Sequence, residues 1–180
     1  MSTAAARMTV DEFLKLPEVE CGKLELIDGE IFPIEYAGFV HARVKSTLNE
    51  ILVLWLSQNR IGRVFVETTY RLDSEEALAP DLSVLRNERL TPVTKDLPQG
   101  APDLAIEVVS SQKADRLHMK IRLYLKYGSK AVWVVYPDQR IIQVNSANGR
   151  AMTLEPDRVL EGLDVLPGFS TPVSAVFEGL

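Results

Sequence analysis

DLAIEVV at residues 103–109 is a nearly continuous apolar stretch, followed by the amphipathic segment ADRLHMKIRLYLKY at 114–127 and the apolar segment AVWVVY at 131–136. The first and third segments have the length and composition of strands that are covered on both faces. The middle segment has the 3.6-residue periodicity of a helix, and Gly128 follows it as a C-cap. Two strands joined by a helical crossover are normally parallel and form a right-handed βαβ unit. We therefore expect these segments at the centre of a sheet.

A long helix and two more strands are predicted upstream of this unit. Apolar residues at helical spacing indicate a helix over 39–58, and β-branched and aromatic residues indicate strands at 63–72 and 81–85. The order is then helix, strand, strand, strand, helix, strand. This order predicts an α/β fold with a mixed sheet and helices on both of its sides.

Shorter elements extend the core at both ends. We expect an N-terminal helix opened by a capping box, a hairpin with an Asp-Gly turn, and two C-terminal strands. They span residues 10–16, 23–36, 140–145 and 151–154. A chain of 180 residues is long enough to bury a full core, so we expect one domain over 9–180 after a flexible segment at 1–8.

Composition narrows the class of protein. No apolar stretch is long enough to span a bilayer, and the N-terminus lacks the apolar core of a signal peptide, so we expect a cytoplasmic protein without membrane contact. The single cysteine, Cys21, fits a reducing compartment and reads as a surface or turn residue rather than a reactive thiol. The net charge of -5 counts against simple nonspecific nucleic-acid binding, although residues 113–130 are locally basic.

Charged residues interrupt the apolar pattern at the centre of the fold. Glu107 lies within the apolar stretch and shares a strand face with Asp103, because side chains alternate along a strand. Lys120 lies on the apolar stripe of the following helix, and Asp81 opens a neighbouring strand. A charge is costly to bury unless it is paired or holds a metal. We therefore expect these side chains to converge.

Two interpretations of this convergence remain open. Two carboxylates can hold Mg²⁺, for which Mn²⁺ can substitute, and the metal activates a water for attack on a phosphodiester. A lysine then orients the nucleophile or stabilises the transition state. The alternative is a structural ion pair between Glu107 and Lys120 at the interface of sheet and helix, which is weak evidence for stability.

An ordered set of short motifs resembles the Uma-type putative restriction endonuclease family of the PD-(D/E)XK nuclease superfamily. No single motif is specific, but together they cover nearly the whole chain after Met8. The motifs are Met8–Phe13, Leu24–Glu30, His41, Pro80-Asp81, Pro102–Ser110, Lys120-x-x-x-Tyr124, Gly128, Val132–Pro137 and Leu166–Phe169. The resemblance implies a restriction-endonuclease-like αβββαβ core, with an added N-terminal hairpin and C-terminal strands.

The resemblance also implies site residues. Asp81 corresponds to the first acid and Glu107 to the acid of the (D/E)XK element. Val109 stands at the lysine position of that element, so the literal motif is broken and Lys120 supplies the lysine from the following helix.

Four other residues are secondary candidates. Glu25 could supply a further carboxylate or be a solvated hairpin residue, and His41 could touch substrate or metal or make a local hydrogen bond. Asp103 could orient the loop before its strand rather than bind metal. Tyr124 is more consistent with a core residue that has a polar tip.

We expect a Mg²⁺-dependent endonuclease that cleaves DNA with Asp81, Glu107 and Lys120. We also expect a homodimer, because cutting both strands of a duplex usually needs two active sites. The alternative is a nuclease-like fold kept for binding nucleic acid or a protein partner, which the acidic balance and the lack of a separate DNA-recognition module favour. A third possibility is an ion-paired α/β domain whose function lies elsewhere.

Overall fold

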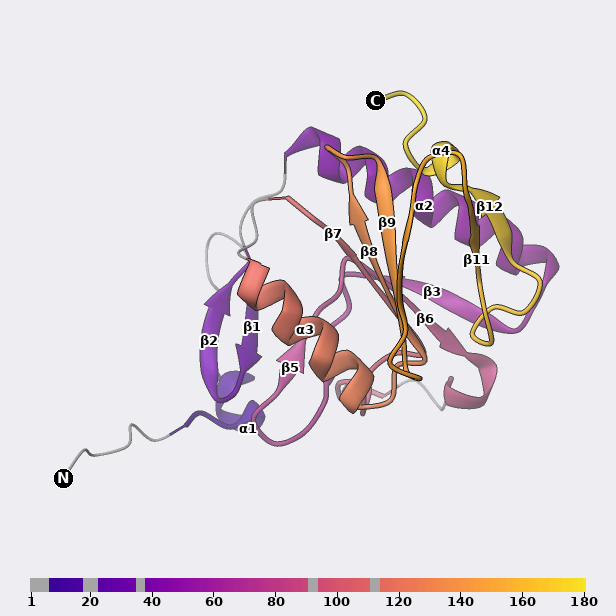
Figure 1. Ribbon diagram of the computed structural model, residues 1–180. Coiled ribbons are helices and arrows are strands. Elements are labelled where there is room, and N and C mark those ends of the chain that lie inside the picture. Colours follow the sequence, from indigo (N-terminus) through magenta and orange to yellow (C-terminus); the bar gives the residue numbers. More distant parts are fainter. Residues whose placement is uncertain (1–6, 18–22, 35–37, 91–93, 111–113) are drawn as a thin grey trace.

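A six-stranded mixed sheet forms the centre of the computed structural model, which describes residues 7–17, 23–34, 38–90, 94–110 and 114–180 (Figure 1). Its strand order is β10-β9-β8-β7-β6-β3. In chain order the strands are β3 (Gly62–Val66), β6 (Leu82–Arg86), β7 (Leu104–Val108), β8 (Ala131–Tyr136), β9 (Ile141–Ser146) and β10 (Ala151–Leu154). β7 and β8 pair in parallel, and the other neighbours in this sheet are antiparallel.

Two helices cover opposite faces of this sheet: α2 (Phe39–Gln58) on one and α3 (Ala114–Lys126) on the other (Figure 1). The alternation of β7 decides which residue faces which helix. Ile106 is buried in the apolar cluster that includes Leu48 of α2, whereas Ala105 is buried in the cluster that includes Ile121 of α3. The order α2-β3-β6-β7-α3-β8 confirms the predicted αβββαβ core.

A second, four-stranded sheet lies beside α3 and contains the predicted hairpin (Figure 1). Its order is β2-β1-β5-β4. The strands are β1 (Leu24–Ile27), β2 (Glu30–Pro33), β4 (Tyr70–Arg71) and β5 (Ala77–Leu78). Asp28 and Gly29 form the hairpin turn with positive φ angles, as an Asp-Gly turn requires. This sheet brings the N-terminal hairpin against the helix that carries Lys120.

The ends of the chain add small elements. The capping box of Thr9 and Glu12 opens α1 (Val10–Phe13), which is shorter than predicted. Near it, the backbone N–H of Met8 donates to Gly29 at 3.1 Å. The short helix α4 (Val173–Val176) and the strands β11 (Val159–Glu161) and β12 (Ser170–Pro172) close the α2 side of the core. Among the described residues, no helix has the length and apolarity needed to cross a membrane.

Several predictions differ from the structure or lie outside it. The strand expected over 63–72 is interrupted between β3 and β4, where Glu67 has a φ of 47°. β5, β11, β12, α4 and the 3₁₀ helix Asn87–Arg89 are absent from the predicted set. Cys21, most of the segment 1–8 and the end of the hairpin near Tyr36 lie outside the described residues.

Candidate active site

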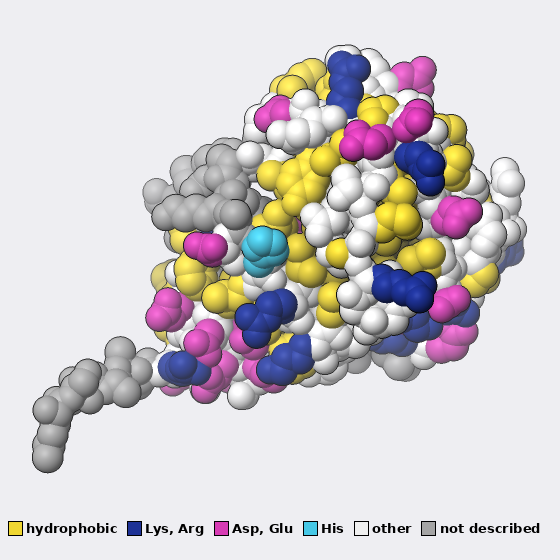
Figure 2. Space-filling model, viewed as in Figure 1, with side chains coloured by type: hydrophobic (Ala, Val, Ile, Leu, Met, Phe, Trp, Pro, Cys, Tyr) yellow, Lys and Arg dark blue, Asp and Glu magenta, His cyan; other side chains and the backbone are white. Residues whose placement is uncertain are grey.

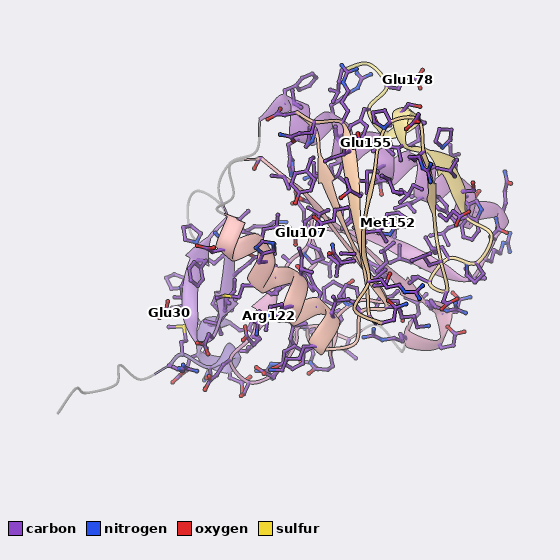
Figure 3. The ribbon with its side chains drawn as sticks, viewed as in Figure 1. Glu30, Glu107, Arg122, Met152, Glu155 and Glu178 are labelled. Atoms are coloured by element: carbon purple, nitrogen blue, oxygen red, sulfur yellow. The ribbon has the colours of Figure 1, made fainter. Side chains whose placement is uncertain are left out.

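Lys120 joins two carboxylates beneath α3. Its Nζ lies 2.7 Å from Oε1 of Glu107 in β7 and 2.8 Å from Oε1 of Glu25 in β1. The Lys120 side chain is only 3% exposed, and both glutamates are equally buried. The Tyr124 hydroxyl, one helical turn further along α3, donates to the same Glu107 oxygen at 2.9 Å. Figure 3 labels Glu107 next to the first half of α3. The four-residue spacing of Lys120 and Tyr124 therefore places both side chains within hydrogen-bonding distance of Glu107.

Glu25 is held on its other side as well. The Arg116 guanidinium donates to Oε2 at 2.9 Å, and the backbone N–H of Ala79 donates to Oε1 at 3.2 Å. Arg116 also stacks over the Phe32 ring, 5.1 Å from its centroid. Glu25 is thus a buried member of the network, and the alternative of a solvated hairpin residue is wrong.

Asp81 lies beside Glu107 at the end of the β6–β7 pair. Leu82 pairs with Ile106, so the register carried one residue further sets Asp81 opposite Glu107. The Asp81 Oδ2 atom accepts the backbone N–H of Val108 at 2.8 Å, which ties the aspartate directly to the strand that carries Glu107. The two acids and Lys120 therefore meet at the same end of the sheet.

Two residues of α2 approach Asp81 from the opposite face. His41 Nε2 lies 3.1 Å from Asp81 Oδ1, and Lys45 Nζ lies 3.9 Å from the same oxygen. His41 is buried, and its Nδ1 has no hydrogen-bond partner among the described residues. A spacing of four residues places His41 and Lys45 on the same side of the helix.

The network perturbs the acidity of its members. Burial raises the pKa of Glu107 to about 7; the Lys120 charge opposes this shift, while the charges of Asp81 and Glu25 add to it. Burial lowers the pKa of Lys120, but the nearby Glu107 and Glu25 carboxylates outweigh it and hold the pKa above its ordinary value. Burial, with Glu107 next to it, also raises the pKa of Tyr124. The Glu107 and Glu25 carboxylates thus favour the protonated form of Lys120, whereas burial favours the neutral form of Glu107.

This donor set fits a hard divalent cation. Among the described residues, no group of three His, Cys, Asp or Glu side chains is arranged to hold a metal. Asp81 and Glu107 supply carboxylate oxygens, the ligand type that Mg²⁺ prefers, and Mg²⁺ usually keeps several waters or phosphate oxygens as its other ligands. Burial is the main cause of the raised pKa of Glu107 and the Asp81 charge adds to it, so a cation bound by both acids would favour the ionised form of Glu107.

Asp103 lies away from this site, at the start of β7. Its Oδ2 accepts the backbone N–H of Arg86 at 2.9 Å and lies 3.8 Å from Arg89. Asp103 therefore positions the segment that follows β6. This agrees with the interpretation that Asp103 orients the loop before its strand rather than binds metal.

Two contributors were not predicted from the sequence. Arg116 lies outside the apolar stripe of α3, yet its side chain reaches Glu25 because it precedes Lys120 by one helical turn. The sequence around Lys45 gives no sign of its role, because the residues that Lys45 contacts come from distant segments of the chain. Figure 2 shows the outer face over α3, where Lys and Arg side chains lie near the middle and acidic side chains gather toward α1 and the β1–β2 hairpin.

An αβββαβ core with two acids and a lysine at one end of its sheet defines a restriction-endonuclease-like protein. The chain belongs to the Uma2 family, described as "Putative restriction endonuclease", whose model matches residues 10–174. It is also similar to a crystal structure from Anabaena variabilis ATCC 29413, described as "a putative nuclease belonging to DUF820". That likeness has 26% identity and a TM-score of 0.83, and it covers 94% of this chain and 97% of the other. No curated protein matches the sequence. Family and neighbour both point to a nuclease.

Proposed function

We propose that the protein is a metal-dependent endonuclease that hydrolyses phosphodiester bonds in DNA. The observation that carries this proposal is the convergence of Asp81, Glu107 and Lys120 at one end of the β6–β7 pair. Membership of the Uma2 family supports the nuclease class. The metal, the DNA substrate and a homodimer that cuts both strands belong to the proposal.

Asp81 and Glu107 would hold Mg²⁺, or Mn²⁺ in its place. When bound, such an ion lowers the pKa of a coordinated water and neutralises charge on the phosphate. Val108 fixes Asp81 through its N–H, and Tyr124 fixes one oxygen of Glu107. The acid pair is thus positioned by hydrogen bonds before any ligand arrives.

Lys120 would stabilise the negative charge that develops on the phosphate. The neighbouring carboxylates raise the pKa of its ammonium group, which lies in a site of low solvent exposure, where electrostatic stabilisation is strongest. Glu25 and Arg116 act as positioning residues, because the carboxylate of Glu25 binds both Lys120 and Arg116. The negative charge of Glu25 also keeps the lysine protonated.

The test combines metal binding and cleavage. Mn²⁺ is titrated calorimetrically into the wild type, Asp81→Ala and Glu107→Ala, and each protein is incubated with supercoiled plasmid DNA and Mn²⁺. We expect wild-type binding and nicking, both lost in the two variants while circular dichroism shows a folded chain. Glu155→Ala removes an exposed acid remote from the pair and serves as the matched control (Figure 3).

Wild-type protein that binds DNA but neither binds Mn²⁺ nor nicks the plasmid would contradict the proposal. That result would favour a nuclease-like fold retained for binding. The pairing of Lys120 with two carboxylates is the observation that favours this second function, because these pairs occupy two of the three N–H donors of its ammonium group.

A further inference from the structure

A second charged cluster lies next to Asp81 and consists of Lys23, Lys45 and Glu67. Lys45 pairs with Oε1 of Glu67 and lies 3.9 Å from Oδ1 of Asp81. Lys23 Nζ donates to Oε2 of Glu67 at 2.6 Å and to its backbone carbonyl at 3.3 Å. Two ammonium groups from distant segments thus converge on one carboxylate at the edge of the proposed site.

The backbone places Glu67 directly beside the acid pair. Val66 pairs with Leu82 in the β3–β6 ladder, and the N–H of Glu67 donates to the carbonyl of Asp81 at 3.1 Å. Glu67 adopts a φ of 47°, a left-handed conformation that is unfavourable for a residue with a Cβ atom. Such conformations are maintained where the surroundings demand them and often mark functional sites.

The cluster carries a net positive charge that solvent can reach. The side chains of Lys23, Glu67 and Lys45 are 52%, 38% and 18% exposed. The hydrogen bonds from Lys23 and Lys45 lower the pKa of Glu67 to about 2, so its carboxylate is ionised at any physiological pH. Two cations and one anion leave one unit of positive charge beside Asp81, in a chain whose net charge is -5. An anionic ligand that reaches this edge would meet two ammonium groups, those of Lys23 and Lys45.

We propose that Lys45 and Lys23 bind a backbone phosphate of the nucleic acid adjacent to the one at the acid pair, and that the Glu67 carboxylate occupies their ammonium groups until the phosphate displaces it. Lysine suits this exchange because its flexible stem and rotatable donors accept a new anion without a fixed bidentate geometry. The inference rests on the proposed function, since it assumes a nucleic-acid ligand at Asp81 and Glu107.

A purely structural role for these ion pairs is the competing explanation. In that case Glu67 would simply tie the start of β1 to the segment between β3 and β4. The two explanations predict opposite effects of removing the Glu67 charge. If Glu67 competes with phosphate, removing its charge leaves Lys23 and Lys45 free to bind phosphate. If Glu67 is only a structural partner, removing its charge lets the two lysine side chains become disordered.

The test measures binding of a fluorescein-labelled DNA duplex of mixed sequence by anisotropy, in EDTA so that no metal-dependent hydrolysis occurs. We expect Glu67→Gln to bind about tenfold tighter and Lys45→Ala about tenfold weaker than wild type, because charged contacts to phosphate dominate such binding. The slope of log Kd against log salt should fall by about 0.9 in Lys23→Ala/Lys45→Ala, because one phosphate contact is lost. Lys130→Ala, an exposed lysine at the other end of the sheet, should change neither quantity comparably.

A double variant separates specific competition from the general loss of one negative charge. In the Lys23→Ala/Lys45→Ala background, Glu67→Gln should give no more gain than Glu30→Gln, an exposed acid of β2. Weaker binding by Glu67→Gln, or a gain that persists without the two lysines, would overturn the inference and leave the proposed function intact. A wild type that does not bind the duplex in EDTA would overturn the inference, and the plasmid-nicking assay with Mn²⁺ would decide the proposed function separately.

Discussion

Replacing Lys120 with methionine should destabilise the protein strongly, because it removes the cation from between two buried carboxylates. Lys120 lies within 2.8 Å of both Glu25 and Glu107, and all three side chains are at most 3% exposed. Breaking a buried ion pair by removing one partner costs about 3–5 kcal/mol, since the other charge stays buried without compensation. Methionine has a similar length and good helix propensity, so packing and α3 itself should change little.

The measured quantity is the free energy of unfolding in urea at pH 7.5, followed by the fluorescence of the buried Trp133. Glu107 and Glu25 raise the pKa of Lys120 above its ordinary value of 10.5, against the opposing effect of burial. The contribution of the Lys120 charge to the free energy of unfolding is therefore fully present below pH 10.5 and is lost only in stronger base. A loss of about 3–5 kcal/mol corresponds to roughly 6–20 °C in Tm for a domain of this size. Arg122→Met, on the exposed side of the same helix, should be nearly neutral and is the matched control.

Adding Glu107→Gln to Lys120→Met should recover part of the loss. The remaining Glu25 carboxylate still has Arg116 as a partner at 2.9 Å, whereas Glu107 would no longer be a buried charge. The double-mutant cycle should therefore give a coupling energy of at least about 1 kcal/mol. A Lys120→Met protein within about 1 kcal/mol of wild type, or strictly additive effects, would refute the argument that burial and pairing determine the energetics of this site.

Two further predictions concern acidity and packing. Glu107→Gln should gain stability relative to wild type as pH rises. Burial raises the pKa of Glu107 from 4.5 to about 7, so the folded wild type binds this proton more tightly than the unfolded chain does. The wild type therefore loses about 3 kcal/mol of stability in total as pH rises between those two values, and the glutamine variant does not. Urea unfolding of both proteins at pH 4.5 and 8 checks this, and a difference that does not change with pH would contradict it. Gly62→Ala should cost about 1–3 kcal/mol, because a Cβ there would lie 2.5 Å from the carbonyl oxygen of Leu85, and wild-type Tm in this variant would argue against that packing of β3 on β6.

Long periodic segments were predictable from the sequence, and short elements were not. The helix over 39–58 and the strand over 131–136 have the predicted limits, because many residues contribute to each pattern. β4 and β5 contain two residues each, which is too short for a periodic pattern, and β5 also pairs with the distant strand β1. Glu67 shows the same limit, since a composition typical of a strand gives no sign of the left-handed φ that interrupts it.

The candidate site was predictable where burial conflicts with charge. Glu107 and Lys120 each occupy an apolar position, and the structure brings them to 2.7 Å. Lys45, Glu67 and Lys23 could not be recognised, because each occupies an ordinary surface position and only the fold brings them to one point. The contact of Arg116 with Glu25 was not predicted, because Arg116 lies outside the apolar stripe, but a long side chain there can still reach a buried acid.

The transfer of the lysine from strand to helix has a structural consequence. Val109 stands two residues beyond Glu107, so a lysine there would emerge on the same face of β7 but about 7 Å further along the strand. From α3, Lys120 reaches Glu107 across the sheet–helix interface and simultaneously meets Glu25 of β1. The second sheet thus becomes part of the site, because its β1 strand supplies the carboxylate that holds the lysine in place. The N-terminal hairpin therefore completes the carboxylate–lysine network, and changes that displace β1 should disturb this network even where the central sheet is intact.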